Sequence, residues 1–167
     1  MQFDIIKRIL LFAVLCVVQA LVLNHIHLFG CATPLLYIWF IMLFRRNTQP
    51  WIILVSSFLL GLCIDTFSNT PGVAAGSATF LAAMQPYILG LFIQRDSPDD
   101  LEPGIKSLGF SSFFLYALIC SLVYCLLFFT LETFNFFNWL QWVECVGGST
   151  LITLVLILVI DNLRGRS

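Results

Sequence analysis

Residues 110–131 read FSSFFLYALICSLVYCLLFFTL and contain no Asp, Glu, Lys or Arg. A helix that spans a bilayer needs about 20 predominantly apolar residues, because the hydrocarbon core is about 30 Å thick. The run is continuous and does not alternate apolar with polar residues, which indicates a helix and not a strand of a membrane barrel. Of all 167 residues, 60% are apolar and only 10% are charged. Because a soluble domain carries about 25% charged residues, part of the solvent around this chain must be lipid.

Five further apolar runs accompany residues 110–131. The predicted spans cover residues 9–24, 29–44, 51–65, 72–93, 110–131 and 139–160. Short loops leave no room for a separate soluble domain, so the sequence predicts one all-α membrane domain over residues 1–167, a six-transmembrane-helix bundle. The second and third spans are short for a bilayer, and we expect them to use polar flanks or a thinner membrane.

The basic residues predict how the bundle is oriented. They fall at the start of the chain, in two of the loops and at the end: Lys7, Arg8, Arg45, Arg46, Arg95, Lys106, Arg164 and Arg166. With six spans they all lie on one face, which is cytoplasmic by the positive-inside rule. The sequence therefore predicts an inner-membrane protein with both termini in the cytoplasm. The loop 94–109, rich in acidic residues and proline, is expected to be an extended, solvated connector.

Residues 61–73, GLCIDTFSNTPGV, form the most informative segment. Asp65 ends an apolar run, and an ionised carboxylate at membrane depth costs roughly 2.5–3.5 kcal/mol on insertion scales unless it is paired or functional. We favour a structural role, in which the carboxylate accepts hydrogen bonds from Ser68 or from backbone N–H groups that open the next helix. Proton or ligand handling and contact with a partner remain open.

Two other features have a structural interpretation and an alternative. Gly72 and Gly76 have the small-xxx-small spacing that lets helix backbones approach closely, and we expect packing within the chain in preference to homodimerisation. Glu144 is expected to extend toward the outer surface. The alternative is a polar contact inside the bundle with Asn24, His25 or Gln141.

The sequence offers little catalytic or metal-binding chemistry. It contains no G-x-S-x-G, H-E-x-x-H or glycine-rich phosphate loop, so we predict that the protein is not an enzyme. His25 and His27 do not complete a zinc site, because two ligands are too few. The six cysteines form no C-x-x-C pair, and we expect them to pack as small apolar side chains. We expect no metal, no cofactor and, at a net charge of −1, no nucleic-acid partner.

The segment 61–73 resembles the pattern of the MreD family of rod-shape-determining membrane proteins. The residues that match are Gly61, Asp65, Ser68, Gly72 and Val73, followed by a helix of small residues and Tyr87. The resemblance implies a fold similar to the substrate-binding subunits of energy-coupling-factor transporters. It also implies a non-enzymatic scaffold that binds MreC and, through MreC, connects MreB filaments to RodA and a class B penicillin-binding protein. RodA and the penicillin-binding protein build peptidoglycan during cell elongation.

A second hypothesis is a binding subunit for a small, vitamin-like molecule. It predicts a polar cavity that opens outward, lined by Asn24, Asp65, Ser68 and Glu144. Most polar side chains in the sequence fall at loop edges and not across helix centres, which favours the scaffold.

Overall fold

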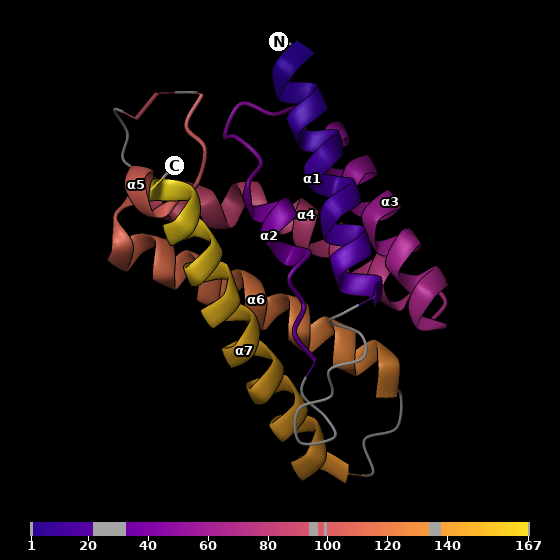
Figure 1. Ribbon diagram of the computed structural model, residues 1–167. Helices are drawn as coiled ribbons and strands as arrows, with labels where there is room; N and C mark the ends of the chain where they lie inside the picture. Colours follow the sequence, from indigo (N-terminus) through magenta and orange to yellow (C-terminus); the bar gives the residue numbers. More distant parts are fainter. Residues whose placement is uncertain (1, 22–32, 94–96, 99, 134–137, 167) are drawn as a thin grey trace.

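The computed structural model describes residues 2–21, 33–93, 97–98, 100–133 and 138–166, and within these residues it is helical without strands (Figure 1). The elements in chain order are α1 (Gln2–Leu21), α2 (Ile38–Met42), α3 (Pro50–Ser68), α4 (Val73–Phe92), α5 (Ile105–Leu108), α6 (Phe110–Thr133) and α7 (Trp139–Arg166). Four of them, α3, α4, α6 and α7, are long and apolar enough to cross a membrane.

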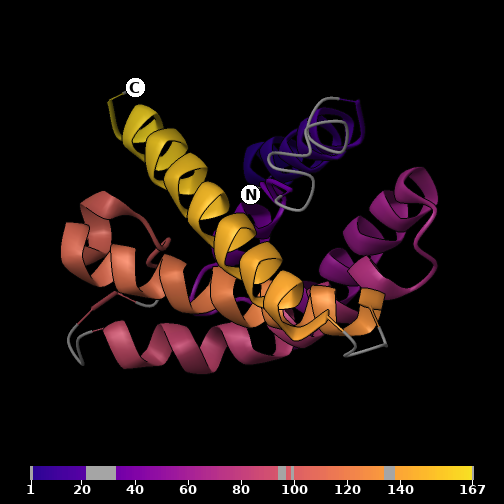
Figure 2. The ribbon, with the colours of Figure 1, turned by 90° about the horizontal axis from the view of Figure 1, so that it is seen from below.

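The long helices pack in the order in which they follow one another. Helix α4 packs against both α3 and α6, and α6 packs in turn against α7, while α1 lies against α3 and α2 (Figures 1 and 2). The start of α1 and the end of α7 lie toward the same end of the molecule, and the end of α7 lies beside α5 (Figure 1). The short helix α2 lies inside the bundle, in contact with α1, α4 and α6.

The outside of the bundle is apolar. Tyr87 and Leu91 on α4 are 75% and 79% exposed, and Leu140 and Leu151 on α7 are 75% and 65% exposed. A protein in water rarely leaves large apolar side chains exposed along whole helices. These faces fit contact with lipid, as expected for a protein that crosses the membrane several times.

Most predicted helices are present, with shifted ends. The predictions for 72–93 and 110–131 agree with α4 and α6 to within two residues. Helix α3 runs to Ser68 and has 19 residues, which span about 28 Å at 1.5 Å per residue, so the prediction of a short third span was wrong. Helix α7 begins at Trp139 as predicted and continues to Arg166. The predicted end of the first span, residues 22–24, lies outside the described residues.

The predicted second spanning helix, 29–44, is wrong in the part that the structure describes. Only the five residues of α2 are α-helical, and residues 33–35 have no regular structure. Pro34 explains part of this, because it lacks an N–H donor and its ring disfavours a helical conformation at Thr33. We call residues 33–44 the buried segment, since every residue from 34 to 42 is buried. Residues 29–32 lie outside the described part of the chain.

The non-helical start of the buried segment takes its hydrogen bonds from side chains of α1 and α7. The backbone N–H of Thr33 donates to Ser149 Oγ (3.1 Å) and that of Leu35 to Thr153 Oγ1 (3.0 Å). Gln19 accepts from the Leu36 N–H (3.1 Å) and donates to the carbonyl of residue 34 (2.9 Å). Backbone outside a helix is tolerated at membrane depth only where protein satisfies its polar groups, and these three side chains do so.

The other end of the buried segment is held from α4 and α6. Gln85 Nε2 donates to the carbonyl of Phe44 (3.3 Å) and to the Tyr116 hydroxyl (3.2 Å), which itself donates to the carbonyl of Met42 (3.3 Å). In between, the Tyr37 hydroxyl shares a hydrogen bond with that of Tyr124. Gln85 and both α6 tyrosines are 0–1% exposed, so the core is organised around this short segment.

Candidate functional site

The turn between α3 and α4, which we call the Asp65 turn, is made by residues that tolerate a left-handed backbone. Asn69 ends α3 at φ 57°, and Gly72 precedes α4 at φ 84°. Glycine adopts a positive φ without steric cost, and asparagine does so more readily than most residues. The turn therefore reverses the chain in four residues and sets the start of α4 beside the last turns of α3.

Asp65 occupies the centre of this turn. Its Oδ1 accepts hydrogen bonds from the backbone N–H of Ala74 (2.8 Å) and from the Thr70 hydroxyl (3.1 Å), and its Oδ2 accepts from the N–H of Ala75 (2.9 Å). The first N–H groups of a helix have no partner within the helix, and the positive end of the helix dipole favours an anion there. The residue is only 6% exposed, so its carboxylate is a buried cap of α4.

Gly61 lies one helical turn before Asp65 and faces the same part of α4. A Cβ atom on Gly61 would lie 2.5 Å from the Ala75 Cα and 2.7 Å from the Ala74 carbonyl oxygen. Real Cβ contacts are never this short, so only glycine permits the observed approach of the two helix backbones. The glycine and the aspartate, four residues apart, thus act together to join α3 to α4.

The remaining predicted positions lie around this joint. Ser68 is partly buried in the last turn of α3, and Gly72 supplies the positive φ. Gly76 lies on the outer side of α4, where a Cβ would meet only the Leu131 side chain at 3.8 Å. The close packing expected at Gly76 occurs instead at Gly61, so Gly76 is left on an exposed face.

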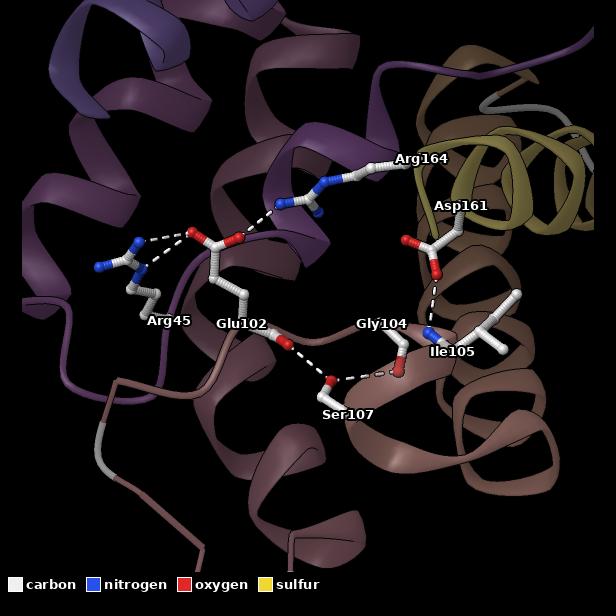
Figure 3. A network of polar contacts seen from close by, with 7 residues as sticks. All are labelled: Arg45, Glu102, Gly104, Ile105, Ser107, Asp161 and Arg164. Atoms are coloured by element: carbon white, nitrogen blue, oxygen red, sulfur yellow. Dashed lines mark hydrogen bonds and ion pairs between the residues drawn. The ribbon is translucent and has the colours of Figure 1, made fainter. Parts of the chain in front are cut away.

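A second polar cluster, the charged end, brings together segments that are far apart in the sequence (Figure 3). Glu102 forms ion pairs with Arg45, at 2.8 Å, and with Arg164. On α7, Asp161 Oδ2 accepts a hydrogen bond of 2.7 Å from the backbone N–H of Ile105, the first residue of α5. The connector 94–109 was predicted to be extended and solvated, but its second half is anchored to α7 by these contacts.

The charge of Glu102 is stabilised by its partners. Partial burial raises the pKa of this carboxyl, but the hydrogen bonds from Arg45 and Arg164 outweigh burial, so the pKa lies below its usual value. The carboxylate is therefore ionised at neutral pH. Because Arg45 follows the buried segment and Arg164 ends α7, this ionised group ties both to the same end of the molecule.

Other predicted positions are dispersed. Glu144 is exposed on α7, in agreement with the expected extension toward the surface, whereas Asn24, His25 and His27 lie outside the described residues. The cavity predicted for a small molecule would need Asp65, Ser68 and Glu144 on one wall. The structure instead uses Asp65 as a cap of α4 and leaves Glu144 on an outer surface. Within the described ranges, no three His, Cys, Asp or Glu residues are grouped around a common metal position.

Comparison with protein families, with curated proteins and with solved structures finds no match to this chain.

Sequence reasoning missed the side chains that hold the buried segment and the charged end. They are Gln19, Gln85, Ser149, Thr153, Glu102 and Asp161. The available signal was a polar side chain in the middle of an apolar helix, which is costly unless it has a partner. Gln19, Gln85 and Thr153 each give this signal.

Proposed function

We propose that this chain is an MreD-like scaffold of the cell-elongation machinery, which binds the transmembrane helix of an MreC protein and helps to position peptidoglycan synthesis. The observation that carries the proposal is the use of the motif residues. Gly61, Asp65 and Gly72 all serve the joint between α3 and α4. Because these motif residues hold two helices together, they suit a protein that presents a rigid surface to a partner.

The proposed topology has six passes, with both termini in the cytoplasm and the second pass made by the buried segment. Its start contacts Ser149, and its end reaches Arg164 through Glu102. Fifteen residues of α7 separate these two positions, or about 22 Å along the helix. These contacts support a segment that runs along α7 over a distance close to that of a hydrocarbon core, which is about 30 Å thick. The ion pairs of the charged end support a common side for Arg45 and Arg164.

The exposed face of α4 is the proposed surface for MreC. Small residues, Gly76, Ala83 and Gly90, are exposed there beside Phe80 and Tyr87. In lipid, helices associate by close packing and polar contacts, because lipid already solvates apolar side chains. A single partner helix can approach closely at the glycines and pack against the two aromatic rings. MreB, RodA and a class B penicillin-binding protein would then be connected through MreC.

The test is recovery of MreC with the tagged protein after gentle detergent extraction. Gly76→Leu should lower recovery, because the leucine fills the contact surface, whereas its Cβ would meet only the Leu131 side chain of the protein itself. Interhelical hydrogen bonds in lipid are worth roughly 0.6–2 kcal/mol, and a loss of packing of the same size would lower the affinity about 3- to 30-fold.

Two control variants make the test specific. Gly147→Leu places the same side chain at an open position of α7, and Leu91→Ala shortens an exposed side chain farther along α4. Gly147→Leu should recover MreC as the unmodified protein does, and Leu91→Ala, at the end of the proposed face, should lose less MreC than Gly76→Leu does. Equal recovery from Gly76→Leu would reject this face, and no recovery of any elongation protein by the unmodified chain would reject the scaffold.

A further inference from the structure

A cavity of about 330 Å³ opens at the charged end of the molecule, between the first half of α1, α2 and the end of α7. Its lining residues are Lys7, Arg8, Leu11, Trp39, Phe40, Leu43, Phe44, Glu102 and Arg164. The volume is within the range of small-ligand sites, about 300–1,000 Å³. None of these residues belongs to the Asp65 turn or to the α4 face.

The charged part of the lining has an excess of cations. Among the described residues, Lys7, Arg8 and Arg164 line the cavity together with one carboxylate, Glu102, which is already paired with Arg164 and with Arg45 from outside the cavity. The Arg8 guanidinium lies 5.0 Å from the centre of the Phe44 ring, so it is held over the cavity wall by a cation–π contact. An anion in the cavity would therefore meet the basic side chains of Lys7 and Arg8, which are not the ion-pair partners of Glu102.

The rest of the lining is apolar and aromatic. Trp39, Phe40 and Phe44 are 3–5% exposed and belong to the buried segment, and Leu11 and Leu43 complete the wall. A free inorganic anion gains nothing from such a wall. A molecule with a charged head and a hydrocarbon part matches both halves of the cavity.

We propose that this cavity binds the phosphate headgroup of an anionic membrane lipid, with the phosphate at Lys7 and Arg8 and the start of an acyl chain against Phe40 and Leu43. Basic pockets between membrane helices on the cytoplasmic side are suited to such headgroups. The phosphate chemistry is shared with free phosphate, but the apolar wall and the position at the ends of membrane helices favour the lipid. This inference does not depend on MreC or on the α4 face.

The test is native mass spectrometry of the delipidated protein after addition of phosphatidylglycerol or, separately, phosphatidylethanolamine. The unmodified protein should retain phosphatidylglycerol in preference to phosphatidylethanolamine. Arg8→Gln should reduce that retention about fivefold, from roughly 1 kcal/mol per basic residue near a membrane surface. The matched control is Arg46→Gln, which removes the same charge from an exposed residue outside the cavity, and it should leave retention unchanged.

Further arms separate the alternatives. Leu11→Trp fills the cavity without changing its charge and should also reduce the retention of phosphatidylglycerol. Such a loss would show that the lipid binds inside the cavity and is not held by surface charge in general. Equal losses in Arg8→Gln and Arg46→Gln, or no preference for phosphatidylglycerol, would overturn the proposal. Calorimetric titration with inorganic phosphate should show no saturable binding, and binding that Arg8→Gln abolishes would assign the cavity to free phosphate and overturn the assignment to a lipid.

Discussion

The Asp65 turn and the buried segment solve the same problem with partners at different distances along the chain. Both place backbone N–H groups in apolar surroundings, where each must be satisfied. At the turn, Asp65 reaches Ala74 and Ala75, nine and ten residues away. In the buried segment, Leu35 depends on Thr153, 118 residues away. The turn is thus a local structure, whereas the segment can form only once the helices around it have assembled.

The Asp65 turn and the buried segment also differ in how much of their structure the local sequence indicates. A glycine, an aspartate and a second glycine within twelve residues specify the turn by their own chemistry. Nothing within residues 33–44 specifies an irregular segment apart from Pro34, because the apolar residues there suit a membrane helix equally well. The following changes test whether the turn and the segment differ in this way.

The largest effect is expected at Gly61. Gly61→Ala places a Cβ atom against the backbone of Ala75 and Ala74, which no side-chain rotation can relieve. Overpacking typically costs about 1–3 kcal/mol, and we expect the upper end in the free energy of unfolding, measured by denaturant titration in detergent. Gly147→Ala, at an open helical position, should instead stabilise by up to about 1 kcal/mol, because alanine favours helix over glycine. Equal effects from the two variants would contradict the close approach.

A smaller effect is expected when the cap of α4 is removed. Asp65→Ala leaves two buried N–H groups without an acceptor and should lower the free energy of unfolding by about 2 kcal/mol. Asp65→Asn keeps one acceptor oxygen and should lose about half as much. The exposed Glu144→Gln serves as the control and should change stability little. If Asp65→Asn and Glu144→Gln had the same small effect, the carboxylate would not be needed as a cap.

The smallest of these effects is expected in the buried segment, where Thr153 contributes a single hydrogen bond. Thr153→Val removes the acceptor for the Leu35 N–H while keeping the side-chain shape, and should cost about 1–2 kcal/mol. Thr66→Val is the matched control, because the exposed Thr66 hydroxyl donates only to a carbonyl of its own helix. Denaturant titration of both variants checks the difference. Similar stabilities would show that the long-range contact does not hold the segment.

The sequence predicted the helical class and most of the bundle, because apolar runs such as 72–93 and 110–131 fix helices by length alone. It placed Asp65 at the correct joint, since an aspartate between two apolar runs has few stable roles. It ended α3 three residues early, because a charged residue was taken as the limit of an apolar helix, whereas here it is buried within the last turn. The Asp65 carboxylate binds the first N–H groups of α4, while α3 itself continues to Ser68.

The rest could not be read from the sequence, for a physical reason. Gln19 lies in α1 whereas Ser149 and Thr153 lie in α7, and only the folded bundle brings them to the buried segment. The same holds for Glu102, whose two arginine partners come from residues 45 and 164. A polar residue in an apolar helix indicates that a partner exists without identifying it.

The central claim, that the buried segment crosses the membrane, can be tested by labelling single cysteines from either side of sealed membrane vesicles. Ile6→Cys and Asn47→Cys introduce thiols at exposed positions before and after the first two passes, and both keep every basic residue. Asn138→Cys, before α7, provides the reference for the opposite end. If α1 and the buried segment both cross, the cysteines at 6 and 47 label from one side and the cysteine at 138 from the other. Labelling of 6 and 47 from opposite sides would mean that residues 33–44 do not cross the membrane.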